Sequence, residues 1–306
     1  MIDRYLPSAG GGQIHACIWE PEETPKGIVQ LVHGIAEHVH RYDDFAEFLA
    51  AKGYLVAAED HMGHGGSISE KTPQGCFSGG WLAAVADVNA LKEQMQKEHP
   101  GLPYVLMGHS MGSFLARTYL YTYPDAGLRA AILSGTAWQP APVLAMGQMM
   151  CRREAKRVGE QNPSATLMNL MFGSYSKRFG KDASPNAWIS SVPEQVSRYE
   201  ADPLCGFAAS SGLCRDMLSG IAMNQRKENL EAMPKGLPVL FLSGDEDPVG
   251  NFGKGVRAAY EAFRKAGMQD VSLRLYPGGR HEMLHEKDAE SVKADLLAWI
   301  ESKTQQ

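Results

Sequence analysis

The pentapeptide Gly108-His-Ser110-Met-Gly112 constrains the fold of this chain more than any other feature of its sequence. It directly follows a short apolar run at residues 104–107 and opens a helix-like segment at residues 110–123. A serine hydroxyl projects from between a strand and a helix only at a sharp turn, and glycine on either side avoids clashes between Cβ atoms there. The motif therefore predicts a strand–turn–helix unit that presents Ser110 as a nucleophile.

The segments on either side of this motif alternate between strand-like and helix-like patterns. Short apolar runs typical of buried strands occur at residues 13–20, 27–33, 54–58, 104–107 and 130–133. Helical patterns occur at residues 41–52, 81–99 and 110–123. Strands that alternate with helices predict a mostly parallel sheet with helices on both faces. The first two strands lie close in sequence, and we expect them to form an antiparallel hairpin.

The alternation stops after Trp138. Residues 139–230 are rich in Met, Arg and Ser and contain short helix-like pieces without an obvious buried strand. Strand-like runs return at residues 238–242 and 271–275, and helical patterns at residues 254–266 and 291–303. We therefore predict an α/β fold whose core comprises residues 1–138 and 231–306, with a helical cap inserted at residues 139–230.

Composition limits the classes of function that the chain can have. A net charge of −5 and the lack of a large basic block argue against a nucleic-acid partner. No run approaches the ~18–20 apolar residues of a membrane span, and the first residues lack the apolar core of a signal peptide. The five cysteines form no CxxC pair, so we interpret them as buried thiols. These features predict a cytoplasmic protein.

A serine nucleophile also needs hydrogen-bond donors for the oxyanion that forms during acyl transfer. One donor normally lies beside the nucleophile, and the other lies in the loop after a different strand. The N–H group of Met111 fits the first position. The N–H group of Ile35, which follows the sequence His33-Gly34 at the end of an earlier buried strand, fits the second. The alternative is that His33-Gly34 forms an ordinary turn.

Two late strands are followed by candidates for the acid and the base of a catalytic triad. Asp247 follows the strand at 238–242, and His281 follows the strand at 271–275. His281 would accept the serine proton, and Asp247 would hold its imidazole in the correct tautomer. Asp245 is the alternative acid, but Asp247 lies deeper in its turn. His285 is the alternative base, although we expect it on the following helix.

Together these motifs resemble those of the monoacylglycerol lipase and lysophospholipase branch of the α/β-hydrolases, of the serine aminopeptidase S33 type. The matching motifs are His-Gly-x-x-Glu-His at 33–38, Asp-x-x-Gly-His-Gly-x-Ser at 60–67, Gly-His-Ser-Met-Gly at 108–112, Asp-Pro-Leu at 202–204, Gly-x-x-Asp at 244–247 and the strand-end His281. The resemblance implies an α/β-hydrolase fold and hydrolysis of single-chain lipid esters through an acyl-enzyme. It also implies that Glu37 and Arg41 lie near the polar head of the substrate.

The predicted cap has two features that suit a lipid substrate. It contains seven methionines whose flexible thioethers suit an apolar acyl tunnel, with simple packing as the alternative: Met146, Met149, Met150, Met168, Met171, Met217 and Met223. Residues 141–150 are largely apolar and precede four basic residues at 152–157. Such a segment can touch a membrane surface transiently, although an ordinary lid helix has the same pattern.

Other classes of function share parts of this pattern. A peptidase, amidase or thioesterase can use the same triad. A metal-dependent hydrolase is suggested by His33, His38, His40, His61 and His64. However, the chain has no HExxH or contiguous HxHxDH run, so we expect neither a metal nor another cofactor. A non-catalytic receptor on this fold usually lacks a triad member, and dehalogenases or epoxide hydrolases need aspartate in place of Ser110.

Overall fold

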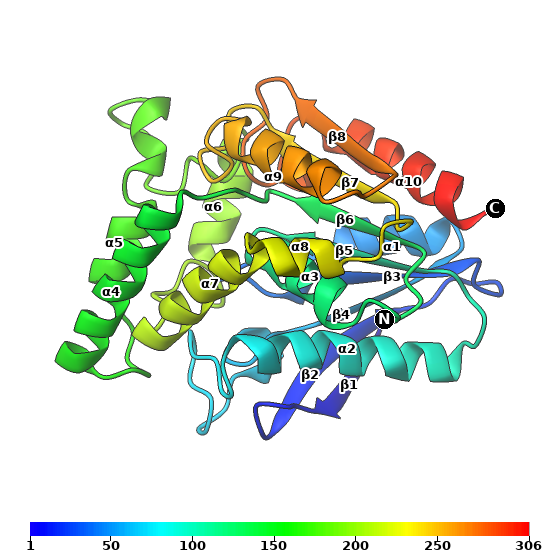
Figure 1. The fold of residues 1–306 in the computed structure, drawn as a ribbon, viewed down its shortest axis with the longest axis horizontal. Coiled ribbons are helices and arrows are strands. Elements are labelled where there is room, and N and C mark those ends of the chain that lie inside the picture. Colours follow the sequence, from blue (N-terminus) through cyan, green and yellow to red (C-terminus); the bar gives the residue numbers. More distant parts are fainter. Residues whose placement is uncertain (306) are drawn as a thin grey trace.

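The computed structural model describes residues 1–305 and contains one eight-stranded sheet with the strand order β1-β2-β4-β3-β5-β6-β7-β8 (Figure 1). The strands are β1 (Ile2–Pro7), β2 (Gln13–Trp19), β3 (Gly27–Val32), β4 (Tyr54–Glu59), β5 (Tyr104–His109), β6 (Ala130–Ser134), β7 (Val239–Gly244) and β8 (Val271–Tyr276). Within the group from β3 to β8, each strand is parallel to every strand with which it pairs. The predicted mostly parallel α/β sheet is confirmed.

The N-terminal edge of the sheet differs from the prediction. Strand β2 pairs antiparallel with β1 on one side and with β4 on the other, so it does not form a hairpin with β3. The expected hairpin between residues 13–20 and 27–33 is therefore wrong. The cause is that β4 lies between β2 and β3 and pairs in parallel with β3. The hairpin partner of β2 is β1, an edge strand whose polar Asp3 and Arg4 gave no strand signal.

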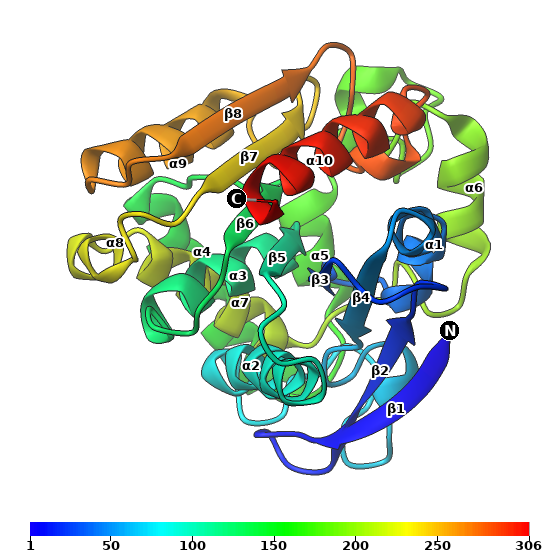
Figure 2. The ribbon, with the colours of Figure 1, turned by 90° about the vertical axis from the view of Figure 1, so that its right-hand side faces the viewer.

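Helices cover both faces of the sheet. Helices α1 (Asp43–Ala51) and α10 (Ala289–Thr304) lie on one face, and α2 (Trp81–Glu98), α3 (Met111–Thr122) and α9 (Lys254–Lys265) lie on the other (Figure 2). Single 3₁₀ turns occur at η1 (Val39–Tyr42), η2 (Gly65–Ser67) and η4 (Met283–His285). The predicted helices at 41–52, 81–99, 110–123, 254–266 and 291–303 thus all occur, with shifted ends.

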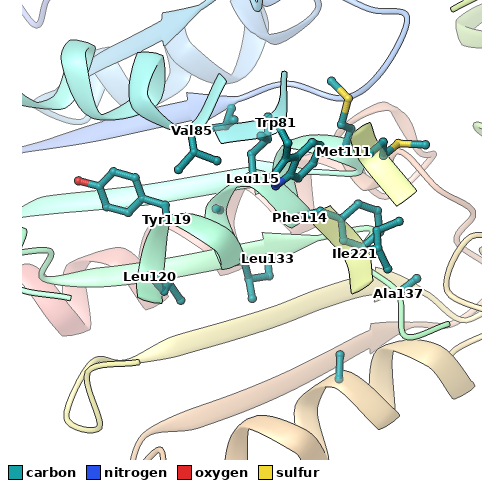
Figure 3. Packing of buried hydrophobic residues seen from close by; sticks show 14 of the residues in the cluster. Trp81, Val85, Met111, Phe114, Leu115, Tyr119, Leu120, Leu133, Ala137 and Ile221 are labelled. Atoms are coloured by element: carbon teal, nitrogen blue, oxygen red, sulfur yellow. The ribbon is translucent and has the colours of Figure 1, made fainter. Parts of the chain in front are cut away.

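The alternation of side chains along the central strands explains why the sheet needs both helical layers. In β6, Ile132 packs in the cluster with α1 and α10, whereas its neighbour Leu133 packs in the cluster with α2 and α3. Successive residues of a strand point to opposite faces, so a strand that is apolar throughout must be covered twice. Figure 3 shows the second of these clusters, to which Trp81, Leu115 and Leu133 belong.

The segment between β6 and β7 is helical and carries no strand of the sheet in residues 1–305. It contains α4 (Ala141–Val158), α5 (Ala165–Phe172), η3 (Tyr175–Phe179), α6 (Pro193–Ala201), α7 (Ser211–Asn224) and α8 (Lys227–Ala232). Ser164 and Ser210 cap α5 and α7 by accepting hydrogen bonds from backbone N–H groups. Helices α4 and α5 lie at the left end of Figure 1. The division of the chain at residues 139–230 stays a prediction.

None of the helices in residues 1–305 is long and apolar enough to cross a bilayer.

Glycine is required where α3 packs against β3. A Cβ atom at Gly112 would lie 1.9 Å from the carbonyl oxygen of Val32, which is far inside contact distance. The backbone of both elements would have to move apart to accept any side chain. The spacing of the serine motif is therefore also a packing requirement of the core.

We expect Gly112→Ala to lower the free energy of unfolding by about 1–3 kcal/mol or more, because the added methyl overpacks a backbone contact. Urea denaturation followed by circular dichroism measures this change. The matched control is Gly236→Ala, since nothing lies within 4 Å of a Cβ atom at Gly236. Equal stability of the two variants would contradict the packing requirement.

Candidate active site

Ser110 occupies the sharp turn between β5 and α3. Its backbone has φ 52° and ψ −119°, a conformation that side-chain-bearing residues rarely adopt and that costs about 1–3 kcal/mol. The turn is held by a hydrogen bond of 2.9 Å from the Ser110 N–H group to the Ser134 carbonyl oxygen. A Cβ atom at Gly108 would lie 2.2 Å from the Gly112 carbonyl oxygen, so glycine is needed at the start of the turn as well.

The candidate acid and base form a buried pair. The Nδ1 atom of His281 lies 2.9 Å from Oδ2 of Asp247. Asp247 is fully buried, and it also accepts hydrogen bonds from the Ser243 hydroxyl and the Val249 N–H group. Three donors thus fix the carboxylate in one orientation. Asp245 is exposed and accepts a hydrogen bond from the Gly278 N–H group, and the structure does not bring it to His281.

His281 is packed on both sides by aromatic rings. The ring of His109, the residue before Ser110, lies 4.7 Å away between centroids, and the ring of Trp188 lies 5.0 Å away. Burial lowers the pKa of His281, but the charge and hydrogen bond of Asp247 outweigh burial and raise this pKa above 6.5. Burial and the nearby His281 hold the pKa of His109 well below its usual range, so His109 packs as a neutral ring.

The alternative base, His285, lies on η4 and has other partners. Its Nδ1 atom is 2.9 Å from Glu282, and its Nε2 atom is 3.0 Å from the carbonyl oxygen of Arg41. Both ring nitrogens are therefore occupied by groups other than Asp247. We expected His285 on the following helix, whereas it lies on η4, a single 3₁₀ turn before α10.

The two residues expected near the substrate head, Glu37 and Arg41, are bound to protein groups. Glu37 accepts hydrogen bonds from the Gly34 N–H group and the Tyr42 hydroxyl. Arg41 forms ion pairs with Glu37 and Glu282. Burial and the charge of Glu282 raise the pKa of Glu37, whereas Arg41 outweighs burial and lowers the pKa of Glu282. This buried network lies directly behind the loop that carries Ile35.

The expected oxyanion donors lie on both sides of Ser110. Met111 is the first residue of α3, where N–H groups have no acceptor within the helix. Ile35 belongs to the loop after β3, and it lines the same cavity as Ser110. A Cβ atom at Gly34 would lie 3.0 Å from the Ser110 Cβ atom, so the backbone of this loop reaches the serine because residue 34 is glycine.

An apolar cavity of about 260 Å³ opens at Ser110. Its walls come from the loop after β3, from α3 and from the helices that follow β6. Four of the seven methionines singled out in the predicted cap line it, namely Met146, Met150, Met171 and Met217. The other lining residues include Phe114, Val143, Leu170, Phe172 and Ile221. The cavity therefore joins the candidate nucleophile Ser110 to an apolar wall of flexible side chains.

The sequence did not predict a segment that contacts the loop of the candidate base, His281. Residues 187–191, between η3 and α6, contact the loop around His281 through their backbone. The N–H group of Glu282 donates to the Ile189 carbonyl oxygen at 2.8 Å, and the Arg280 guanidinium donates to the Ser190 carbonyl oxygen at 2.9 Å. Because these contacts use carbonyl groups and a loop, no pattern of residue types would reveal them.

The histidines that suggested a metal hydrolase do not lie around the candidate triad. His33, His61 and His64 pack against one another in the core, with centroids 4.0 Å apart for the first two. Burial lowers the pKa of His61 to about 3 and that of His64 to about 4, so these rings are neutral. Within residues 1–305, two other groups of side chains have the spacing of metal ligands, and neither contains Ser110, Asp247 or His281.

A mostly parallel eight-stranded sheet, with a serine on the turn from its fifth strand into a helix, defines an α/β-hydrolase. The sequence profile of the family described as "Serine aminopeptidase, S33" matches residues 23–288. The chain is 33% identical to the monoacylglycerol lipase of Mycolicibacterium smegmatis, covering 98% of this chain and 97% of that one. It is 29% identical to the monoglyceride lipase of Homo sapiens, covering 98% and 90%.

Solved structures agree with these sequence relatives. A thermostable carboxyl esterase from Bacillus coagulans superposes with a TM-score of 0.89 at 30% identity, covering 99% of this chain and 98% of that one. The chain therefore belongs to the serine aminopeptidase S33 family of α/β-hydrolases, on the branch of the monoacylglycerol lipases, and it is a carboxylic ester hydrolase.

The two candidate acids can be separated by substitution. We expect Asp247→Asn to lower kcat by up to about 10⁴-fold, because the amide holds His281 in the wrong tautomer. Asp245→Asn should leave kcat within about threefold, since Asp245 contacts only a backbone N–H group in the next loop. Steady-state hydrolysis of a p-nitrophenyl ester measures both. A severe loss in Asp245→Asn and a mild one in Asp247→Asn would show that the acid is misassigned.

Proposed function

We propose that this enzyme cleaves carboxylic esters of single-chain lipids, of the monoacylglycerol or lysophospholipid type, through an acyl-enzyme on Ser110. The observation that carries the proposal is the apolar cavity of about 260 Å³ in which Ser110 lies beside four cap methionines. An acyl chain is the part of an ester that gains free energy from such a wall, at about 25 cal/mol per Å² buried. A substrate without an apolar chain would gain no such free energy from this wall.

In this mechanism, Ser110, Asp247 and His281 act as a triad. His281 accepts the proton of Ser110 as the hydroxyl attacks the ester carbonyl, and then donates it to the departing alcohol. Water repeats the same steps to release the fatty acid. Asp247 orients the imidazole through Nδ1 and stabilises the imidazolium. Three donors, of which His281 is one, hold the Asp247 carboxylate in a single orientation.

The oxyanion of the tetrahedral intermediate would be bound by the N–H groups of Ile35 and Met111. Both belong to segments that are fixed by close packing, so the donors need not reorganise during the reaction. The Met111 N–H group has the additional advantage of the partial positive charge at the start of α3.

The alcohol part of the substrate would lie toward Glu37 and Arg41. These residues form a buried ion network with Glu282, next to the base. A polar glycerol or phosphoglycerol head is compatible with charged neighbours, whereas the acyl chain is compatible with the methionine wall. The monoacylglycerol and monoglyceride lipases among the relatives support glycerol as the alcohol.

The cap also offers a surface for collecting lipid. Val143, Met146 and Leu170 have 48%, 55% and 50% of their area exposed, although all three line the cavity. Apolar side chains that continue from a cavity to the surface would let the cap contact a membrane transiently. The basic residues at the end of α4 would favour an anionic bilayer. We propose this contact for a protein that otherwise resides in the cytoplasm.

A second candidate function follows from the name of the matching family, which is that of an aminopeptidase. An aminopeptidase has to bind a charged α-amino group, for which a carboxylate in the cavity is the natural partner. The described residues that line the cavity around Ser110 include neither Asp nor Glu, and Glu37, on the side proposed for the alcohol, is already paired with Arg41. Ester hydrolysis therefore fits the site better than removal of an N-terminal residue, and the same holds for amide substrates that carry a charge.

Activity against a series of esters tests the proposal. We expect kcat/KM for glyceryl and p-nitrophenyl esters to rise from acetyl to decanoyl, because each added methylene buries apolar area against the methionine wall. Ser110→Ala should lower kcat by about 10⁶-fold and serves as the blank. A profile that is flat or falls with chain length would contradict a lipid substrate. Turnover of the series by Ser110→Ala would contradict the serine mechanism.

The pH dependence follows from the state of His281, which must be neutral to accept a proton. Because its pKa is raised above 6.5, we expect kcat/KM to rise with pH through an apparent pKa above 6.5 and to fall at lower pH. Removing the charge of Asp247 lowers that pKa, so the residual activity of Asp247→Asn should inflect at a lower pH. Asp245→Asn is the control, with an unchanged profile. Identical profiles in all three proteins would contradict the coupling of Asp247 to His281.

A further inference from the structure

A second group of reactive side chains lies far along the chain from the triad, on one face of the β1–β2 hairpin. Asp3 and Cys17 are direct partners in the antiparallel register of the two strands. His15 lies two residues before Cys17 on β2, so its side chain points to the same face. His40, on η1, brings a ring nitrogen to within 4.8 Å of both the Asp3 carboxylate and the Cys17 sulfur. A carboxylate, a thiol and the imidazole of His40 thus converge from three elements, and the ring of His15 lies against the first two.

The distances among Asp3, His15 and Cys17 are close to those between the ligands of a metal ion. Oδ1 of Asp3 lies 3.0 Å from Nε2 of His15 and 3.5 Å from Sγ of Cys17, and that sulfur lies 3.8 Å from the same His15 nitrogen. Zinc binds sulfur at about 2.3 Å and nitrogen or oxygen at about 2.0–2.2 Å, which places neighbouring ligands of a tetrahedral ion roughly 3.3–3.6 Å apart. The three measured separations lie around this range.

We propose that Asp3, His15, Cys17 and His40 form a binding site for Zn²⁺. Thiolate, imidazole and carboxylate are the side-chain ligands that zinc takes. The ring centroids of His15 and His40 lie 6.3 Å apart, so a shift of the half-exposed His40 toward the other three ligands would complete a tetrahedral, structural coordination shell. Binding releases the proton of the Cys17 thiol and the proton on Nε2 of His15 to solvent. The site opens to solvent at Asp3 and His40, whose side chains are 59% and 38% exposed, so an ion can enter.

The groups around the ligands support this assignment. The other nitrogen of His15, Nδ1, lies 2.8 Å from Asp60, a fully buried carboxylate. Asp60 is itself fixed by the N–H groups of Val39 and Gly66. A histidine that binds a metal through one nitrogen characteristically donates the other N–H to such a carboxylate, which sets its orientation. His40 has a similar neighbour, since its Nδ1 atom lies 3.3 Å from Asp43.

The alternative is a purely ionic cluster, in which a protonated His15 bridges Asp3 and Asp60. Both aspartates are within hydrogen-bond distance of its ring nitrogens. In that alternative, Cys17 is a core thiol that donates to Asp3, and His40 is a surface histidine beside Asp43. It gives no reason for the His40 ring to lie within 4.8 Å of both Asp3 and Cys17. The zinc site uses all four side chains.

A zinc ion here would be structural and not catalytic. It would tie the edge hairpin to η1, which begins directly after the loop that carries Ile35. The proposal departs from the expectation, drawn from the sequence, that the chain binds no metal. That expectation treated His40 as part of a hydrolytic centre, whereas the proposed site does not include the triad. The inference does not depend on the proposed function.

Metal binding to the full-length, untagged protein tests the inference. After removal of metal with a chelator, titration with ZnCl₂ should show one equivalent bound. Titration with CoCl₂ should give the absorption bands of tetrahedral cobalt together with a thiolate-to-cobalt charge-transfer band. We expect Cys17→Ser to remove the charge-transfer band. His40→Gln, at a half-exposed position, should weaken Zn²⁺ binding by at least about tenfold. If Cys17→Ser does not fold, His40→Gln alone decides.

Two cysteine variants serve as matched controls. Cys214→Ser changes a buried thiol of α7 and should bind as the wild type does. Cys205→Ser removes a thiol from the other group with ligand spacing, which comprises His38, Asp202 and Cys205, and should also bind as the wild type does. No zinc bound to the wild type, binding unchanged in both Cys17→Ser and His40→Gln, or binding lost only in Cys205→Ser would each overturn the inference.

Discussion

The strained turn at Ser110 is the constraint on which the rest of the site depends. A serine with φ 52° is unfavourable by about 1–3 kcal/mol, so its surroundings have to hold it. They do so through backbone groups: Gly108 and Gly112 allow β5, α3 and β3 to approach closely, and the Ser134 carbonyl oxygen accepts the serine N–H. The hydroxyl is therefore positioned by the most deeply buried part of the sheet. In the proposed mechanism, this fixed position of Ser110 sets where the oxyanion donors and the base have to lie.

The segment between β6 and β7 contacts both the cavity at Ser110 and the loop that carries His281. Methionines of its helices line the cavity at Ser110, and residues 187–191 brace the loop that carries His281 through backbone carbonyl groups. The ring of Trp188 also packs on the imidazole. A movement of these helices that admits a substrate would therefore also shift the contacts made with His281 and its loop. In the proposed mechanism, the wall that selects the acyl chain and the contacts that orient the base belong to the same inserted segment.

The sequence was informative where a function requires particular residues and where buried strands are apolar. The turn at Gly108–Gly112, the strands from β3 to β8 and the position of Asp247 and His281 at strand ends could all be predicted. Strand β1 was missed because an edge strand with Asp3 and Arg4 lacks an apolar pattern, and β2 was given the wrong partner because sheet order depends on long-range pairing. The bracing by residues 187–191 and the convergence of Asp3, His15, Cys17 and His40 depend on tertiary contacts, which no local pattern encodes.

The central claim is that Ser110 is the group that becomes acylated. The most direct measurement is mass spectrometry of the protein after reaction with an organophosphate ester, which leaves a stable phosphoryl group on an activated serine. The account predicts one adduct per chain, on the peptide that contains Ser110, with loss of esterase activity in proportion to labelling. Complete inactivation with the adduct on another residue, or ester hydrolysis that continues while Ser110 is fully labelled, would contradict it.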